Sequence, residues 1–354
     1  LFSVAYSLYG GLKAVAFTDI IQVVLLIFGG LFLSYTALDL IGQGEGIIAG
    51  FAALTEQAPE KFDMILAKDS EHYMDLPGLS VLVGGMWIMN LSYWGFNQYI
   101  IQRTLAAKSL REGQKGIAFA AFLKLLMPVI VVLPGIAAVV LLPNLERPDQ
   151  AYPQLMNLMP VGLKGLVFAA LVAAIVSSLA SMTNSIATIF TMDLYKSDAK
   201  PRSEQHYVNV GRFVSLGALI IAMVVAQPLL GQFDQAFQYI QEFTGFFTPG
   251  IVVLFITGMF WKKTTANAGL CAAIGSFVLS LVLKYSWPTL PFMDRVGIVF
   301  LSCLAIAVVV SLIENKTQEK AIDLNGVSFK TSNGFNIATV AVIAILIAFY
   351  SAWW

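Results

Sequence analysis

Long apolar runs separated by short polar connections dominate this sequence. Nine of them hold no charged residue over about the length that a helix needs to cross a bilayer. They lie between Asp19 and Asp39, Asp75 and Arg103, Lys124 and Glu146, Lys164 and Asp193, Arg212 and Asp234, Glu242 and Lys262, Lys263 and Lys284, Arg295 and Glu314, and from Lys330 to the end. Hydrocarbon does not tolerate unpaired backbone, and the runs lack the alternation of barrel strands. We therefore expect an all-α integral membrane protein with about nine spanning helices and the tail of a tenth at residues 1–10.

Composition supports the membrane class and narrows the possible partners. Of the 354 residues, 58% are hydrophobic and only 12% are charged, which is unusual for a soluble domain. The 21 basic and 21 acidic residues balance, so the chain has no electrostatic footprint for nucleic acid. Cys271 and Cys303 lie in apolar runs, and no pairing of nucleophile with base or set of metal ligands is visible. We expect neither a nucleic-acid-binding protein nor an enzyme.

The charges of the connections predict the orientation. Residues 103–116 carry four basic residues and one acidic residue, whereas residues 42–79 carry seven acidic and two basic residues. The positive-inside rule makes the first connection cytoplasmic and the second external, which predicts a multi-pass protein of the cell (inner or plasma) membrane with Trp354 outside. Because the chain starts at Leu1 within apolar sequence and without a charged leader, we expect a fragment whose N-terminal part is absent.

One predicted span is unusually rich in hydroxyl groups. In AAIVSSLASMTNS, Ala174 and Ser178, like Ser177 and Ser181, stand four residues apart and so share a helix face. Small residues of this kind allow close packing of membrane helices, and serine can bond to the carbonyls of its own helix. Alternatively, adjacent hydroxyls and a freed carbonyl offer neutral oxygen ligands to a hard monovalent cation such as sodium.

Two charges near predicted spans also allow two interpretations. Asp19 stands at the predicted start of a helix, where a carboxylate can cap the N-terminus, but a charge in a span also indicates a functional cavity. Lys124 is expected two or more turns inside the membrane, where it either faces a polar cavity or extends its side chain to the interface.

The stretch MNLSYWGFNQYIIQR combines amides with aromatic rings. Asn90, Tyr93 and Asn97 are spaced for one helix face, with Trp94 beside them. A sugar ring can stack on an aromatic plane while its hydroxyls bond to amides. Aromatic residues near the ends of spans are also common interfacial anchors.

The stretch YIQEFTGFFTPG places Gln241 and Glu242 ahead of a Thr-Gly and a Thr-Pro-Gly sequence. Gly and Pro in a span predict either a simple kink or a discontinuous helix of the kind at which transporters bind solute.

At these residues the sequence resembles the sodium/solute symporter family, and within it the bacterial sodium/galactose and sodium/glucose cotransporters. The resemblance is carried, in family order, by LYGGLKAVAFTDIIQ, YWGFNQYIIQRTLAAKS, AAFLKLLMPVIVVLPGIAA, SSLASMTNSIATIFTMDLY and AFQYIQEF. It implies a partial LeuT-type core of inverted repeats. On that basis residues 1–354 are one transmembrane transporter domain fragment: 1–41 end the first repeat, 80–261 form the second, and 262–354 add C-terminal helices.

The resemblance also implies a cation site. The carbonyl of Ala174 and the hydroxyls of Ser177 and Ser178 resemble the protein half of a sodium site, and Asp19 resembles an acid involved in sodium coupling. Family members that move two sodium ions have threonine where this chain has Ala180, so we expect one sodium ion per solute.

The remaining matches imply a solute site. Tyr93 resembles the aromatic residue that stacks on the sugar and closes the inner gate, with Asn90 beside it and Trp94 as a packing neighbour. Lys124 and Gln241 resemble polar contacts to sugar hydroxyls. The expected partners are thus a monosaccharide, sodium and the lipid bilayer.

The resemblance implies sodium-coupled symport of a monosaccharide of the galactose or glucose type by alternating access. One alternative is another solute on the same scaffold, such as an inositol, a sialic acid, an amino acid or iodide. A more distant alternative is a membrane sensor that binds a solute without moving it.

Overall fold

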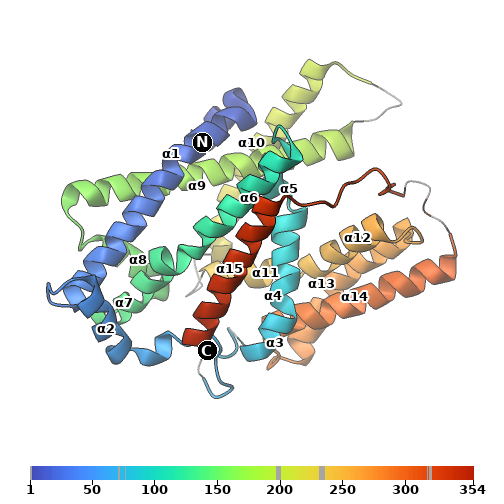
Figure 1. Ribbon diagram of the computed structural model, residues 1–354. Coiled ribbons are helices and arrows are strands. Elements are labelled where there is room, and N and C mark those ends of the chain that lie inside the picture. Colours follow the sequence, from blue (N-terminus) through green and yellow to red (C-terminus); the bar gives the residue numbers. More distant parts are fainter. Residues whose placement is uncertain are drawn as a thin grey trace. The chain divides into compact units, whose positions relative to one another are not determined.

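The computed structural model describes residues 2–354 except 71, 76, 197–200, 231–235, 317, 319 and 320, and gives the backbone alone for 2–18, 227, 229 and 230 (Figure 1). Every regular element within this described part is a helix. The chain forms two compact units: unit 1 contains Leu1–Phe62 and Ile117–Gln235, and unit 2 contains Asp63–Gly116 and Ala236–Trp354. The division of the domain by repeats into 1–41, 80–261 and 262–354 stays a prediction.

Unit 1 contains the two long helices, α1 and α9, that carry the residues of the predicted cation site. Its elements are α1 (Phe2–Ile41), α2 (Ile47–Gln57), η1 (Pro59–Lys61), the part of α6 (Leu110–Leu125) from Ile117 onward, η3 (Pro128–Val132), α7 (Leu133–Leu141), η4 (Pro148–Gln150), α8 (Ala151–Met156), α9 (Val161–Ile189), η5 (Phe190–Tyr195) and α10 (Glu204–Leu230).

Unit 2 combines the short helices between Asp63 and Gly116 with the helices from Ala236 to the end of the chain. Its elements are α3 (Gly78–Val83), α4 (Gly85–Leu91), η2 (Ser92–Phe96), α5 (Gln98–Leu105), the first part of α6, α11 (Ala236–Gly245), α12 (Thr248–Phe260), α13 (Ala266–Ser286), α14 (Phe292–Glu314) and α15 (Asn333–Ala352).

The predicted membrane class is confirmed. Among the described residues, seven helical segments are long and apolar enough to cross a bilayer, and the bent pair α11 and α12 brings the number to eight. The remaining predicted run, between Asp75 and Arg103, is helical but is divided among α3, α4, η2 and α5. Our expectation of one continuous helix there is therefore wrong. The chain breaks at Gly84 and Asn97, neither of which has helical backbone angles.

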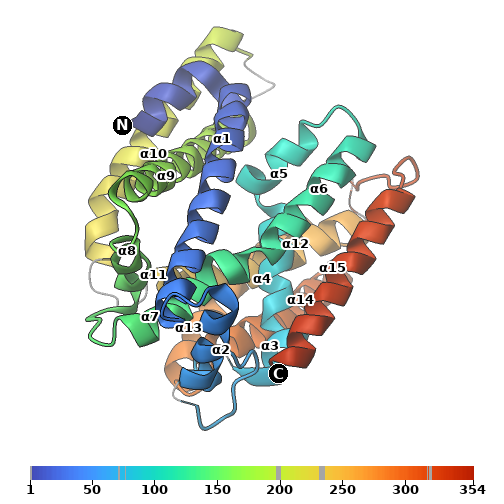
Figure 2. The same ribbon diagram turned by 60° about the vertical axis from the view of Figure 1, so that its left-hand side comes forward.

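In unit 1, α1 packs across α9 and also contacts α2 and α7 (Figure 2). Two glycines permit the close approach: a Cβ on Gly29 would lie 2.6 Å from Val167 of α9, and one on Gly30 would overlap Ile130 of η3. The π-helical turn η3 begins at Pro128, whose ring removes a helix hydrogen bond. Pro134 likewise lacks the N–H that the Val129 carbonyl would meet five residues on in a π-helical turn, and the Ser34 hydroxyl of α1 lies 2.5 Å from that carbonyl.

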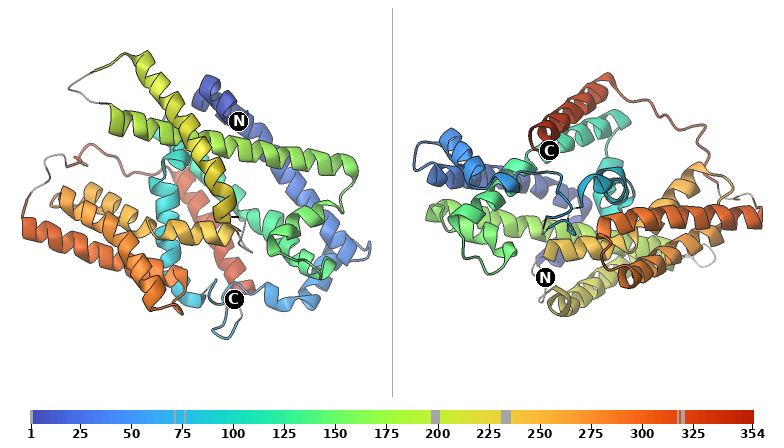
Figure 3. Two further views of the ribbon diagram at one scale, coloured as in Figure 1. Left: turned by 180° about the vertical axis from the view of Figure 1, so that it is seen from behind. Right: turned by 90° about the horizontal axis from the view of Figure 1, so that it is seen from below.

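In unit 2, α12, α13 and α14 pack against one another (Figure 3). Their shared core is fully buried and consists largely of small side chains: Val253, Ala268, Ala272, Val299, Cys303 and Ala307. Thr265 caps α13 by accepting a hydrogen bond from the Ala268 backbone at 3.3 Å. Small residues bring these helices close enough for dispersion contacts, which drive helix association in lipid.

The pair α11 and α12 forms a broken helix with a bend of 45°. The bend follows the sequence, since Gly245 ends α11 and Pro249 occupies the first turn of α12. Ser276 of α13 donates a 2.8 Å hydrogen bond to the Phe246 carbonyl at the bend. Of the two possibilities left open for YIQEFTGFFTPG, a simple kink and a discontinuous helix, the structure shows the discontinuous helix.

Gly250 is predicted to be essential for the packing of α12 on α13. A Cβ there would lie 2.7 Å from the Ala272 carbonyl oxygen and 2.8 Å from Ser276 Cβ. Gly250→Ala should destabilise the protein by on the order of 1–3 kcal/mol, because backbone cannot easily move aside. Thermal unfolding in detergent measures the effect.

Gly258 of the same helix provides the matched control. A Cβ at this position meets nothing within 4 Å, so Gly258→Ala should leave the melting temperature unchanged or raise it slightly. Equal melting temperatures for the two variants would contradict the packing argument.

Candidate functional site

The structure brings two predicted sodium-site residues of unit 1 into contact. Asp19 on α1 is half-buried, Ser177 on α9 is 5% exposed, and the Ser177 hydroxyl donates a hydrogen bond to the Asp19 carboxylate. The expected position of Asp19 at a helix start is wrong, because α1 runs unbroken from Phe2 to Ile41. Asp19 is thus no N-terminal cap, and its carboxylate accepts from a side chain of another helix.

The other hydroxyls of α9 have different partners. Ser181 donates to the Ser177 carbonyl at 3.1 Å, and Thr183 donates to carbonyls of its own helix. Such bonds fit the interpretation of this stretch as a packing face. Ser177 differs from them, since its hydroxyl bonds to a carboxylate on α1.

The two remaining sodium-site candidates lie next to this contact along α9. Ala174 is half-buried and Ser178 is exposed. Since α9 is continuous from Val161 to Ile189, the freed carbonyl that the cation interpretation invoked is not present in this stretch. A helical carbonyl still has a second lone pair, so the Ala174 oxygen remains a possible cation ligand.

Lys124, the solute-site candidate of unit 1, lies in the last turn of α6. Its side chain is exposed within the described chain, and the π-helical turn η3 starts four residues later at Pro128. The lysine therefore stands next to an irregular segment of a span, as substrate-binding residues of transporters often do.

In unit 2, Tyr93 belongs to an aromatic cluster. Its ring meets Trp94 edge to face at 5.1 Å and Tyr99 at 6.1 Å between centroids. The Tyr99 hydroxyl donates to the Tyr93 hydroxyl at 3.1 Å. Edge-to-face pairs hold a ring in place while its other face stays open for stacking. Tyr93 and Trp94 are 41% and 47% exposed, respectively.

The expected single face of Asn90, Tyr93 and Asn97 is wrong. Asn90 lies near the end of α4, Tyr93 lies in the π-helical turn η2, and Asn97 has extended backbone angles between η2 and α5. A π-helical turn and a break change the angular spacing on which the expectation depended.

Asn90 remains close to a recess in unit 2. Its side-chain amide donates to the Met86 carbonyl at 2.9 Å. The residue also lines a groove of about 770 Å³ formed by α3, α4, α12 and α14, whose walls are mainly apolar.

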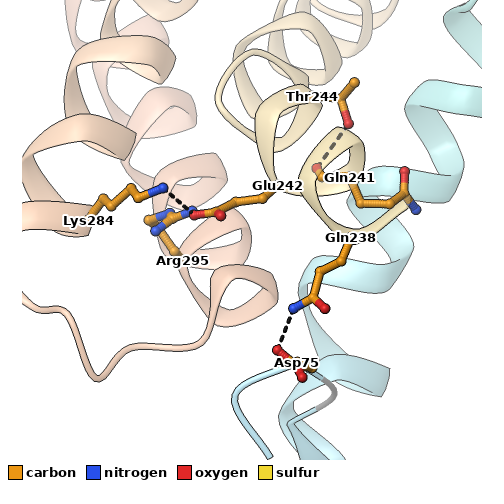
Figure 4. A network of polar contacts seen from close by, with 7 residues as sticks. All are labelled: Asp75, Gln238, Gln241, Glu242, Thr244, Lys284 and Arg295. Carbon is orange, nitrogen blue, oxygen red and sulfur yellow. Dashed lines mark hydrogen bonds and ion pairs between the residues drawn. The ribbon is translucent and has the colours of Figure 1, made fainter. Parts of the chain in front are cut away.

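Gln241 lies in the middle of α11, one residue before Glu242. Figure 4 shows the two side chains leaving α11 on opposite sides. The Gln241 carbonyl accepts a 3.0 Å hydrogen bond from the Thr244 hydroxyl. Glu242 faces α13 and α14, where it pairs with Lys284 and Arg295. Gln241 therefore presents its amide on the face of α11 that is turned away from this ion cluster.

Sequence reasoning missed Tyr99 as a partner of Tyr93. In a continuous helix, residues six apart differ by about 240° and about 9 Å along the axis, so they do not meet. The break at Asn97 makes their contact possible. An extended Asn ahead of a helix is a start signal that the sequence did contain, but it conflicted with the length of the charge-free run.

The candidate residues thus form two sets. The sodium candidates and Lys124 belong to unit 1, and Asn90, Tyr93, Trp94 and Gln241 belong to unit 2.

Comparison with known proteins adds independent information. The family described as "Sodium:solute symporter family" matches residues 1–275. A sodium/glucose cotransporter of Vibrio parahaemolyticus is 48% identical over all of this chain and 69% of its own length. The human sodium/myo-inositol cotransporter 2 is 36% identical over 78% of this chain, which spans 45% of the human protein.

A solved structure shows the same fold. It is described as the substrate-bound outward-open state of a Na+-coupled sialic acid symporter. It matches 90% of this chain and 66% of its own, with a TM-score of 0.70 and 22% sequence identity. The predicted LeuT-type class is therefore confirmed. With the family match and the 48% identity, these findings identify a multi-pass membrane transporter rather than an enzyme: the chain belongs to the sodium:solute symporter family.

Proposed function

We propose that the protein to which this chain belongs couples the inward movement of one sodium ion to the uptake of one monosaccharide of the galactose or glucose type. Family membership supports sodium as the coupling ion. The observation that carries the proposal for the cation is the contact between Ser177 and Asp19, which joins a neutral oxygen ligand to a carboxylate between two long helices.

Sodium would be held by hard oxygen ligands on α9: the Ala174 carbonyl and the Ser177 and Ser178 hydroxyls. A hydroxyl that coordinates sodium through an oxygen lone pair points its proton away from the ion, so coordination by Ser177 is compatible with its hydrogen bond to Asp19. Asp19 then provides an acceptor for that proton and a negative charge near the ion. This arrangement favours a monovalent cation over a neutral molecule.

The sugar would be held by groups of complementary character. The Tyr93 ring, supported by Trp94, offers an apolar plane for one face of the pyranose. Amides of Asn90 and Gln241 and the ammonium of Lys124 would exchange hydrogen bonds with its hydroxyls. Tyr93 would also close the inner gate, and its movement would release the sugar during alternating access.

The energetics of this scheme are adequate for accumulation. Moving one elementary charge inward gains about 2.3 kcal/mol per 100 mV. At that potential a single sodium ion can drive roughly fifty-fold accumulation of sugar, before its own concentration gradient is added.

Myo-inositol is the second candidate solute. It is also a hydroxylated ring, and the human relative at 36% identity is named for it. Competition of unlabelled inositol and galactose against labelled galactose uptake separates the two candidates.

Substitution of Ser177 tests the sodium site. In proteoliposomes that contain the whole protein, Ser177→Ala should raise the sodium concentration for half-maximal galactose uptake at least about tenfold, because it removes a ligand. Ser302→Ala is the matched control, since this half-buried serine donates to the carbonyl of Ile298 in its own helix at 2.9 Å. Uptake that ignores an imposed sodium gradient would refute the scheme.

Substitution of Tyr93 tests the sugar site. Tyr93→Ala should raise the galactose concentration for half-maximal uptake roughly tenfold or more through loss of stacking. The sodium concentration for half-maximal uptake should change less. Tyr285→Ala, at a tyrosine that is 78% exposed, controls for loss of an aromatic side chain. Unchanged galactose uptake kinetics in the Tyr93 variant would contradict its proposed role.

A further inference from the structure

A cluster of three charges holds α11 against its neighbours in unit 2. One carboxylate oxygen of Glu242 accepts from Arg295 of α14 at 2.7 Å and from Lys284 of α13 at 2.9 Å (Figure 4). The side chain of Arg295 is only 7% exposed, that of Glu242 is 27% exposed and that of Lys284 is 41% exposed. A guanidinium buried to this degree requires a partner, so separation of α11 from α14 is strongly disfavoured.

An aromatic ring completes the cluster. The guanidinium of Arg295 lies 5.2 Å from the centre of the Phe246 ring, and the ammonium of Lys284 lies 5.6 Å from it. These are cation–π distances. Phe246 stands at the bend between α11 and α12, and its carbonyl accepts from Ser276. Glu242 and Phe246 therefore attach the C-terminal half of α11 to α13 and α14.

A second contact attaches the start of α11. Gln238 donates to the carboxylate of Asp75, which belongs to the segment before α3 (Figure 4). With α12 bent away by 45°, the direction of α11 is not inherited from a longer helix. Contacts made by its own side chains must set it.

Gln241 lies between these two attachments, about 100° around α11 from Glu242, and its side chain points away from the ion cluster. Rotation of so short a helix moves both faces together. A charge cluster is a suitable determinant of rotation because the fork of Arg295 prescribes the direction of approach, whereas apolar contacts tolerate sliding.

We propose that Glu242, Arg295 and Lys284 are positioning residues that fix the rotation of α11 and thereby the reach of Gln241 toward the solute. This inference rests on the proposed function, in which Gln241 bonds to a sugar hydroxyl. The cluster contains none of the sodium candidates and none of the proposed solute contacts, so its loss should change solute affinity selectively.

The test is a double-mutant cycle in the whole protein reconstituted in proteoliposomes, with galactose as the solute. Glu242→Gln should raise the galactose concentration for half-maximal uptake roughly five- to tenfold, because Arg295 loses its charged partner and α11 can rotate. The sodium half-saturation should change less than about twofold. In the Gln241→Ala background, Glu242→Gln should have little further effect on galactose half-saturation, since it acts through Gln241.

The outcomes separate this proposal from the one on which it rests. If Gln241→Ala leaves galactose half-saturation unchanged, Gln241 is no solute contact and both proposals for this residue fail. If Gln241→Ala weakens galactose binding but the two effects multiply independently, the positioning role alone is overturned. Glu314→Gln is the matched control, because it removes a carboxylate that accepts from Asn267 at 2.6 Å far along α14, and it should alter neither half-saturation constant.

Glu242→Gln alone leaves a buried positive charge and can impair folding. The paired variant Glu242→Gln with Arg295→Met removes both charges and restores a packable interior. It should reach the membrane in normal amounts yet retain the weakened galactose half-saturation. Normal galactose affinity in this paired variant would overturn the proposal, as would an equal loss of sodium and galactose affinity.

Discussion

A backbone carbonyl that is released inside a membrane must find a donor within the protein. This constraint governs where the spans of the chain can be irregular. At η3, Ser34 places its hydroxyl 2.5 Å from the carbonyl of Val129, and at the bend between α11 and α12, Ser276 donates to the carbonyl of Phe246 at 2.8 Å. In each case a buried serine of a neighbouring helix supports the break, so the chain can depart from regular helix there at little cost.

The sequence predicted the class of fold correctly because long charge-free runs have one physical outcome in lipid. It predicted the bend after Gly245 because Gly and Pro act locally. It did not predict the breaks at Gly84 and Asn97, or the continuation of α1 through Asp19. Those features depend on which groups of neighbouring helices form hydrogen bonds with the backbone at a break, and no single run of sequence contains that information.

The candidate site shows the same division. Residues of one short stretch, such as Tyr93 and Trp94, were predicted together and pack together in the structure. The contact of Asp19 with Ser177 joins positions 158 residues apart, and that of Glu242 with Arg295 joins positions 53 apart. Separations of this size are set by the packing of whole helices. The family resemblance implied that Asp19 and Ser177 both serve the sodium site, but only the structure shows that their side chains are in contact.

The contrast between an unbroken α9 and the interrupted segments around Tyr93 and Gln241 has an evolutionary consequence. A continuous helix keeps its oxygen atoms at fixed separations, which would suit recognition of one ionic radius if α9 carries the proposed sodium site. Short helices held by a few side-chain contacts can be re-aimed by single substitutions. Two relatives of this chain are named for sodium with glucose and for sodium with myo-inositol, and a solved structure of the same fold is described as a Na+-coupled sialic acid symporter. Under the proposed assignment, this architecture would let the solute change between relatives while the driving ion stays the same.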